Sequence, residues 1–303
     1  MDSAGTLLVL LAATASASKA IFVKLCYRQH VDPTTVLALR MLLSLPFFAV
    51  AAAVDAMRGR GAPGRLPLTR RDLGGIVALG VLGFYLSSLF DFMGLAYISA
   101  ALERLILFTY PTFVVILSAL FLRQRITRGV AAALLTSYAG MALVLAHDAG
   151  GATRDLWKGG ALVALSTLTY STYLMGSGAL IARLGARRFT SLVMLASSAA
   201  VFVQFALTRP LAALRVAPAV WLWAGAMALV ATVMPVYLMS AGMARIGAAR
   251  TAMLSAVGPV ITIVMGVLFL GEQLTWVQAL GAAFVIVGVW LSAPRRVQQQ
   301  VAR

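Results

Sequence analysis

Long apolar runs separated by short polar stretches dominate the chain. Each run is close to the ~20 residues that an α-helix needs to cross about 30 Å of hydrocarbon. The pattern predicts ten transmembrane helices and hence an all-α membrane protein. The expected spans are Leu7–Val23, Thr34–Val54, Leu73–Tyr97, Leu105–Leu122, Val130–Ala146, Gly160–Ile181, Leu192–Leu207, Ala217–Met243, Thr251–Leu270 and Val277–Ala293.

Composition strengthens this prediction and narrows the range of partners. Of the 303 residues, 61% are hydrophobic and 11% are charged, and the mean hydropathy is +0.94. A soluble protein carries roughly 25% charged residues. The net charge of +16 comes mostly from arginines between the apolar runs. We therefore expect a lipid bilayer and a small-molecule substrate as partners, with no nucleic acid and no obligate protein partner. With one cysteine and two histidines, we also expect no metal site and no cofactor.

The distribution of lysine and arginine predicts the orientation. If the N-terminus is cytoplasmic, 16 of these residues fall in inner loops and the C-terminal tail, and 7 fall in outer loops. Inner loops of membrane proteins are enriched in basic residues. We therefore expect both termini to be cytoplasmic.

The second half of the chain repeats the first. Residues 94–143 align without a gap on residues 242–291, at a constant offset of 148. The shared positions include Gly94/Gly242, Pro111/Pro259, Thr127/Thr275 and Gly140/Gly288. We expect two five-helix repeats, at 1–148 and 149–303. Because five is odd, the second repeat enters the membrane from the opposite side, and such inverted repeats are typical of secondary transporters with a central site.

Two segments carry a family resemblance. "GLAYISAALERLILFTYPTFVVILSALFLRQRIT" resembles the fourth-span signature of EamA-type members of the drug/metabolite transporter superfamily. "GMARIGAARTAMLSAVGPVITIVMGVLFLGEQLT" is the better match, because the first copy has Arg123-Gln124 in place of Gly271-Glu272. Chain length and aromatic-rich third and sixth spans also resemble the YddG-like amino-acid exporters. The resemblance implies a multi-pass protein of the cell inner (plasma) membrane with its substrate between the spans.

Proline is expected to bend two of these spans. Pro111 and Pro259 each remove an intrahelical hydrogen bond, which predicts a kink. The kinks are either symmetric hinges that let each half rock or static bends that improve packing.

Aromatic and polar residues recur at helical spacing. Such spacing places each set on one helix face, where it lines a cavity or bonds between packed helices. The candidate substrate-binding residues are Tyr85, Ser88, Phe92, Phe108, Tyr170, Tyr173, Met234, Tyr237 and Ser255. Since the family places substrate between these spans, we expect alanine at Tyr85 or Tyr237 to lower transport.

Three ionisable residues lie within the expected spans: Lys19, Arg40 and Asp91. Intramembrane charges are costly and suggest function. Asp91 is expected to pair with Lys19 or Arg40. The alternative is that these residues contact the ammonium or carboxylate of a zwitterionic substrate. No carboxylate is expected near the midplane, which favours facilitated movement over proton exchange.

The functional prediction is an exporter of amino acids, aromatic ones included, that works by alternating access through a central cavity. Export of drugs or other metabolites is the alternative within transport. A membrane enzyme finds no convergent catalytic set in the sequence, so we expect no enzymatic activity. A membrane scaffold would not need two kinked, inverted halves.

Overall fold

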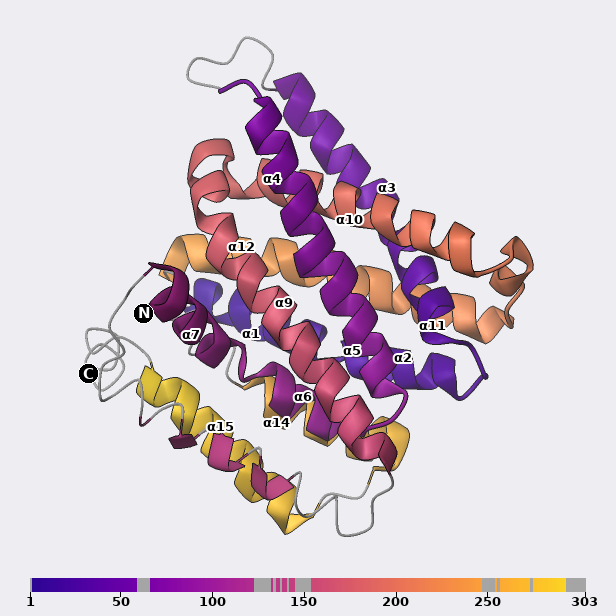
Figure 1. Ribbon diagram of the computed structural model, residues 1–303, viewed down its shortest axis with the longest axis vertical. Coiled ribbons are helices and arrows are strands. Elements are labelled where there is room, and N and C mark those ends of the chain that lie inside the picture. Colours follow the sequence, from indigo (N-terminus) through magenta and orange to yellow (C-terminus); the bar gives the residue numbers. More distant parts are fainter. Residues whose placement is uncertain are drawn as a thin grey trace.

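The chain folds into a bundle of helices in the computed structural model, which describes residues 2–58, 66–122, 132, 135–136, 138–140, 142–144, 154–246, 254, 257–272 and 275–292 (Figure 1). Within these ranges every element is helical and none is a strand. The α-helices are α1 Ser3–Ala17, α2 Lys19–Tyr27, α3 Pro33–Arg58, α4 Arg70–Gly80, α5 Ser87–Leu95, α6 Ala100–Leu107, α7 Tyr110–Leu122, α9 Arg154–Leu184, α10 Ala186–Thr208, α11 Pro218–Ala228, α12 Met234–Ile246, α14 Gly258–Met265 and α15 Trp276–Ser292. Single π-helical turns are η1 Val81–Leu86, η3 Leu229–Val233 and η4 Gly266–Leu270, and η2 Leu211–Leu214 is a 3₁₀ turn.

Five stretches of the described residues are long and apolar enough to cross a membrane. They are Ser3–Tyr27, Pro33–Arg58, Arg70–Leu95, Ala186–Thr208 and Pro218–Met239, with shorter apolar helices at Gly258–Leu270 and Trp276–Gly288. These stretches contain or overlap seven of the ten expected spans. Of the expected span Val130–Ala146, the structure describes residues 132, 135–136, 138–140 and 142–144, and these are helical.

Helix ends extend beyond the apolar runs because polar side chains cap them. The Thr69 side chain accepts a hydrogen bond from Asp72 N–H, and the Asp72 carboxylate accepts one from Thr69 N–H. This capping box starts α4 ahead of the expected Leu73. Hydropathy alone does not detect such polar first turns.

The fourth span begins earlier than we expected and is broken. Ser99 caps α6 by accepting a hydrogen bond from Leu102 N–H, so the helix starts at Ala100 rather than Leu105. Glu103 and Arg104, which lie between the expected third and fourth spans, therefore belong to a helix. The Glu103 side chain is fully buried. The expectation that Lys19, Arg40 and Asp91 are the ionisable residues inside the bundle was therefore incomplete.

The two halves of the chain interlock through matching helix pairs. In Figure 1, α5 of the first half lies beside α9 of the second half, and the equivalent pair is α12 of the second half with α1 of the first half. A β-carbon on Gly94 would lie 2.5 Å from Val163 Cγ2 and 2.9 Å from the Gly159 carbonyl oxygen. A β-carbon on Gly242 would lie 2.5 Å from Val9 Cγ2 and 3.1 Å from the Gly5 carbonyl oxygen. Only glycine permits these two close approaches.

Irregular turns also recur at the sequence offset of 148. The π-turns η1 and η3 begin at Val81 and Leu229, which differ by that offset. The helix is also interrupted just before both Pro111 and Pro259. There the Thr109 N–H donates to the Ile106 carbonyl at 3.0 Å and the Val257 N–H donates to the Leu254 carbonyl at 3.3 Å, again at matching positions.

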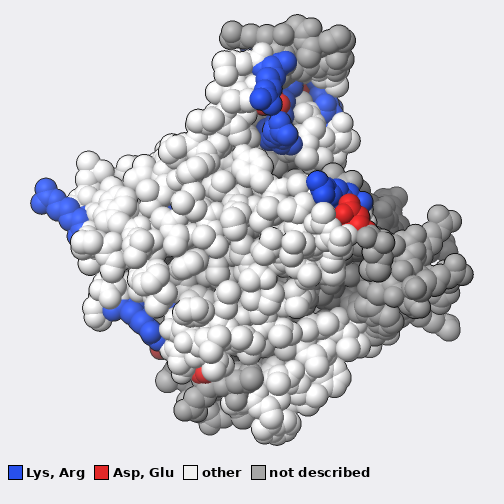
Figure 2. All heavy atoms as spheres, turned by 180° about the vertical axis from the view of Figure 1, so that it is seen from behind, with Lys and Arg blue, Asp and Glu red and all other residues white. Residues whose placement is uncertain are grey.

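The outer surface is apolar over a broad area. Figure 2 shows Lys and Arg gathered at the margins of the described surface, with a wide uncharged region between them. Exposed apolar side chains on the long helices include Leu7, Val50, Val203 and Leu222. Such a surface suits contact with lipid rather than with water.

Candidate functional site

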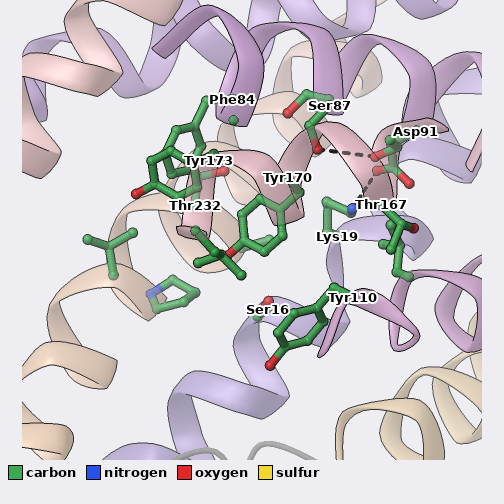
Figure 3. Close-up of a pocket in the computed structure, with 18 of the residues that line it drawn as sticks. Ser16, Lys19, Phe84, Ser87, Asp91, Tyr110, Thr167, Tyr170, Tyr173 and Thr232 are labelled. Atoms are coloured by element: carbon green, nitrogen blue, oxygen red, sulfur yellow. Dashed lines mark hydrogen bonds and ion pairs between the residues drawn. The ribbon is translucent and has the colours of Figure 1, made fainter. Parts of the chain in front are cut away.

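A cavity of about 610 Å³ lies between the helices of the two halves (Figure 3). Its lining comes from α1, α2, α3, η1, α5, α6, α7, α9, α10, η3 and α12. From the sequence we expected spans one, three, four, six, eight and nine around it. No described residue of the ninth span is on the lining, whereas spans two and seven contribute Arg40, Thr190 and Met194.

Matching positions of the two halves face this cavity. The lining residues of the third span each correspond, at the offset of 148, to a lining residue of the eighth. The pairs are Gly83/Ala231, Phe84/Thr232, Ser87/Pro235, Ser88/Val236 and Asp91/Met239. On the first and sixth spans the offset is 154, with the pairs Ala13/Thr167, Ser16/Tyr170 and Lys19/Tyr173.

Charged side chains occupy one side of the cavity. We call Lys19, Arg40, Asp91 and Arg104 the charged wall. Lys19 Nζ lies 2.5 Å from Asp91 Oδ2 (Figure 3). It also lies 3.2 Å from Oε1 of Glu103, which is fully buried and is not part of the lining. Of the two partners that the sequence allowed for Asp91, the structure selects Lys19.

The two arginines of the charged wall keep hydrogen-bonding capacity. Arg40 Nη2 donates to Ser88 Oγ at 3.0 Å, and its guanidinium lies 5.2 Å from the Phe92 ring centre. The Arg104 guanidinium lies 5.7 Å from the Phe108 ring centre. The Nε atoms of both arginines are buried without a hydrogen-bond partner among the described residues. Buried unpaired donors of this kind require an explanation, such as a bound group.

Glycine makes room for Arg104. A β-carbon on Gly258 of α14 would lie 2.9 Å from Arg104 Nη2. The Arg104 guanidinium, from the first half, therefore packs against the Gly258 backbone, from the second half.

Aromatic rings form a continuous arc next to the charges. We call Phe84, Phe108, Tyr110, Tyr170 and Tyr173 the aromatic wall. Successive ring centres are 6.1 Å apart for Phe108–Tyr110, 6.0 Å for Tyr110–Tyr170, 5.7 Å for Tyr170–Tyr173 and 5.0 Å for Tyr173–Phe84. These spacings are those of favourable aromatic pairs. In Figure 3, Phe84 and Tyr173 lie on one side of the pocket and Lys19 and Asp91 on the other.

The side-chain hydroxyl of Ser171 stabilises the break between α6 and α7, next to the aromatic wall. Pro111 has no N–H, and the chain turns at Phe108 and Thr109. Ser171 Oγ of α9 donates to the Tyr110 carbonyl at 3.1 Å. The break is thus held by a neighbouring helix, as expected for irregular backbone inside a membrane protein.

The cavity collects some of the residues predicted from the sequence but not others. On its lining are Lys19, Arg40, Ser88, Asp91, Phe108, Tyr170 and Tyr173. Away from it are Tyr85, Phe92, Met234 and Tyr237. Ser255 lies outside the described residues.

The four predictions that were wrong, for Tyr85, Phe92, Met234 and Tyr237, have one physical cause. The sequence gives helical spacing but not which face points inward. Phe92 is fully buried in the apolar core, and Tyr85 packs against that core. Met234 and Tyr237 are 43% and 39% exposed, on the face opposite Pro235 and Met239. Tyr237 therefore changes from a proposed contact to a useful control.

Several lining residues were missed. Arg104 and Tyr110 sit next to the break, and Thr167 and Phe84 fall on the correct faces of their helices. Two signals could have revealed some of them. Ser99 is a recognisable helix cap, and the offset of 154 relates Thr167 to Ala13.

An apolar helix bundle around a partly charged cavity defines a multi-pass membrane transporter. Comparison with known proteins agrees. The sequence profile of the EamA-like transporter family matches residues 3–146 and again residues 157–293. The chain belongs to this family, which confirms the resemblance to EamA-type members of the drug/metabolite transporter superfamily.

Individual relatives carry the same general description. The chain is 34% identical over 300 residues to the uncharacterised transporter YcbK of Bacillus subtilis, covering 95% of this chain and 93% of that protein. It is 22% identical over 277 residues to an uncharacterised transporter of Archaeoglobus fulgidus, covering 88% and 91%. A solved crystal structure aligns over 99% of both chains at 20% identity, with a TM-score of 0.66, and so shares the fold.

Proposed function

We propose that the protein is an inner-membrane secondary transporter that exports amino acids, aromatic ones included, by alternating access through the central cavity. One observation carries the proposal: a charged wall and an aromatic wall face the same cavity. An amino acid has the same two parts, a zwitterionic end and a side chain. The similarity to YddG-like exporters agrees with this substrate class.

The charged wall suits the zwitterionic end of the substrate. The unpaired Nε atoms of Arg40 and Arg104 are donors for a carboxylate, and Asp91 Oδ1 is a buried, unpaired acceptor for an ammonium group. Charge-assisted bonds of this kind are the strong ones in proteins. The cavity volume of about 610 Å³ lies within the usual range for small-molecule sites.

The aromatic wall suits the side chain of the substrate. Tyr110, Tyr170 and Tyr173 offer ring faces and edges together with hydroxyls. A substrate ring can stack there, and aliphatic side chains can pack more weakly. We therefore expect aromatic amino acids to bind more tightly than small ones.

Paired irregularities support alternating access. The family profile matches twice, and the breaks before Pro111 and Pro259 occur at matching positions. We propose that the two five-helix repeats are inverted and that these breaks act as hinges. A static role for the breaks is the alternative, and it predicts that rigidifying the turn leaves transport unchanged. The bias of basic residues favours cytoplasmic termini.

Efflux from proteoliposomes tests the function directly. Purified protein is reconstituted with radiolabelled phenylalanine or threonine inside, and protein-dependent loss of label is followed. Tyr170→Ala should weaken phenylalanine transport about tenfold, because an aromatic contact and buried apolar area are both lost. Tyr237→Ala is the matched control, since its side chain is 39% exposed and away from the cavity. Equal effects of the two replacements would contradict the site.

Export of drugs or other metabolites is the second candidate. The aromatic wall alone favours it, because apolar cations and ring compounds also bind such surfaces. Folded protein that moves neither amino acid but effluxes an aromatic cation such as ethidium would replace the amino-acid proposal with this one.

A further inference from the structure

A buried carboxylate stands directly behind the charged wall. Lys19 Nζ lies between Asp91 Oδ2, at 2.5 Å, and Glu103 Oε1, at 3.2 Å. The Lys19 side chain is 17% exposed, the Asp91 side chain 3% and the Glu103 side chain 0%. Two carboxyl groups therefore share one ammonium group in a place that water barely reaches.

Other charges around α6 do not supply a direct partner for Glu103. Arg104 is its neighbour on the helix and lines the cavity, and Lys24 of α2 interacts electrostatically with both Glu103 and Glu272. Arg40 of α3, a helix that packs on α5, interacts electrostatically with Asp91 and not directly with Glu103. Glu272, which follows η4, accepts a hydrogen bond from Ala100 N–H at the start of α6. Helices α14 and α15, which also pack on α6, contain no charged residue, and α9 carries its charges only near its ends.

Most carboxylate oxygens of Glu103 and Asp91 also lack a hydrogen-bond donor. Apart from the 3.2 Å ion pair with Lys19, neither carboxylate oxygen of Glu103 accepts a hydrogen bond in the described part of the chain, and Asp91 Oδ1 accepts none either. Two adjacent buried carboxylates cannot both remain ionised at low cost, so such pairs hold a proton between them. The proton lets Glu103 be buried without a full charge and gives one carboxyl a donor for the other.

We propose that the Asp91–Glu103 pair is a proton-binding site, and that the ammonium group of the substrate competes with the proton for this pair. The second part rests on the proposed function. In the empty cavity the pair holds one proton and one negative charge, which Lys19 contacts directly and with which Arg40 interacts electrostatically through Asp91. When the substrate carboxylate binds the arginines and its ammonium group reaches Asp91 Oδ1, a further cation contacts the pair. The O–H bond then breaks, its electrons stay on the carboxylate oxygen, and the proton passes to water in the cavity.

This competition couples the two movements. Proton and substrate occupy the pair alternately, so export of an amino acid is accompanied by uptake of a proton. The expectation of facilitated movement relied on the absence of a carboxylate near the midplane. The burial of Glu103 adds a carboxylate inside the bundle that this expectation did not consider. Asp91 contacts the cavity, whereas Glu103 acts through Asp91 and Lys19.

Infrared spectroscopy tests the proton site without any substrate. The full-length protein in detergent should show, at neutral pH, the C=O stretching band of a protonated carboxyl group that disappears on titration to alkaline pH. Glu103→Gln and Asp91→Asn should each abolish this band, because the remaining carboxylate then has Lys19 to itself. Asp155→Asn, at an exposed position of α9, is the matched control and should leave the band unchanged. A wild-type protein without the band, or the same band in both variants, would overturn the proton site.

Proton movement in proteoliposomes tests the competition. With phenylalanine on one side and a trapped pH indicator, the wild type should move protons opposite to the amino acid. The number of protons moved per phenylalanine should fall at least tenfold in Glu103→Gln and stay constant in Asp155→Asn. An unchanged ratio in Glu103→Gln would reject the coupling. Absent phenylalanine flux in the wild type, with the infrared band intact, would instead reject the proposed function and leave the proton site standing.

Discussion

The two halves of the molecule place equivalent residues on the cavity but give them different chemistry. Lys19 corresponds to Tyr173 and Asp91 to Met239. Arg40 corresponds to Met194 at the same offset of 154. Among the described lining residues, every charged one thus comes from the first half, while the second half contributes hydroxyls, rings and thioethers.

The comparison shows that the helix arrangement is shared by the two halves, whereas the side chains on the cavity lining differ. Helix pairing, π-turns and helix breaks recur in both halves, because each half must bury the same apolar faces. The lining side chains are free to diverge, since they contact the cavity rather than a neighbouring helix. A symmetric framework with an asymmetric lining can hold a substrate whose two ends differ.

The largest effect on transport is expected when a charged lining residue of the first half is replaced by a neutral one. Arg104→Gln should lower amino-acid efflux about 10- to 100-fold, because a charge-assisted bond to the substrate carboxylate is lost. Radiolabelled efflux measures the effect, and yield and thermal melting verify folding. Arg215→Gln, at an exposed position, serves as the control. Undiminished efflux from Arg104→Gln would show that the carboxylate binds elsewhere.

Alanine at Gly94 and at Gly242 tests whether the helix packing of the two halves is equivalent. Gly94→Ala and Gly242→Ala each place a β-carbon 2.5 Å from a valine methyl and close to a carbonyl oxygen. Each replacement should lower the free energy of unfolding by about 1–3 kcal/mol, and the two losses should be similar. Thermal melting in detergent measures them, with Gly178→Ala as the control because nothing lies within 4 Å of its β-carbon. A large loss in one half only would argue against equivalent packing.

The smallest expected effect is on stability, from the two helix caps at equivalent positions of the two halves. Thr69 caps α4 with its side chain, whereas Ala217, the equivalent residue at the start of α11, makes no side-chain cap. Thr69→Ala should cost about 1 kcal/mol of stability, and Ala217→Ser should gain a few tenths to 1 kcal/mol. Chemical denaturation of the two variants side by side measures both. Stabilisation by Thr69→Ala would contradict the assigned cap.

Much of the fold could be read from the sequence, because hydrophobic length and proline are strong local signals. The long helices Pro33–Arg58 and Ala186–Thr208 enclose the apolar runs expected there. The offset between Pro111 and Pro259 anticipated the two matching breaks. These features depend on neighbouring residues in the chain, so no knowledge of packing is needed.

The cavity was harder to predict because helix rotation and burial depend on distant residues. Nothing adjacent in the sequence marks Glu103 as buried, since its partner Lys19 lies on another helix. Helical spacing correctly grouped Tyr170 with Tyr173 but could not show that Tyr237 points outward. Each of these facts is decided by how whole helices dock.

The π-turns η1 and η3 have a consequence for chain length. A π-turn accommodates one more residue than the α-helical turn it replaces, and an α-helix rotates by about 100° per residue. Deleting one residue from either turn would rewind that helix and swing everything beyond it by a quarter of a circle or more. For η1, the residues that swing include Ser88 and Asp91. One extra residue at each of two matching positions, in η1 and in η3, thus sets the direction of the helix segments that face the cavity.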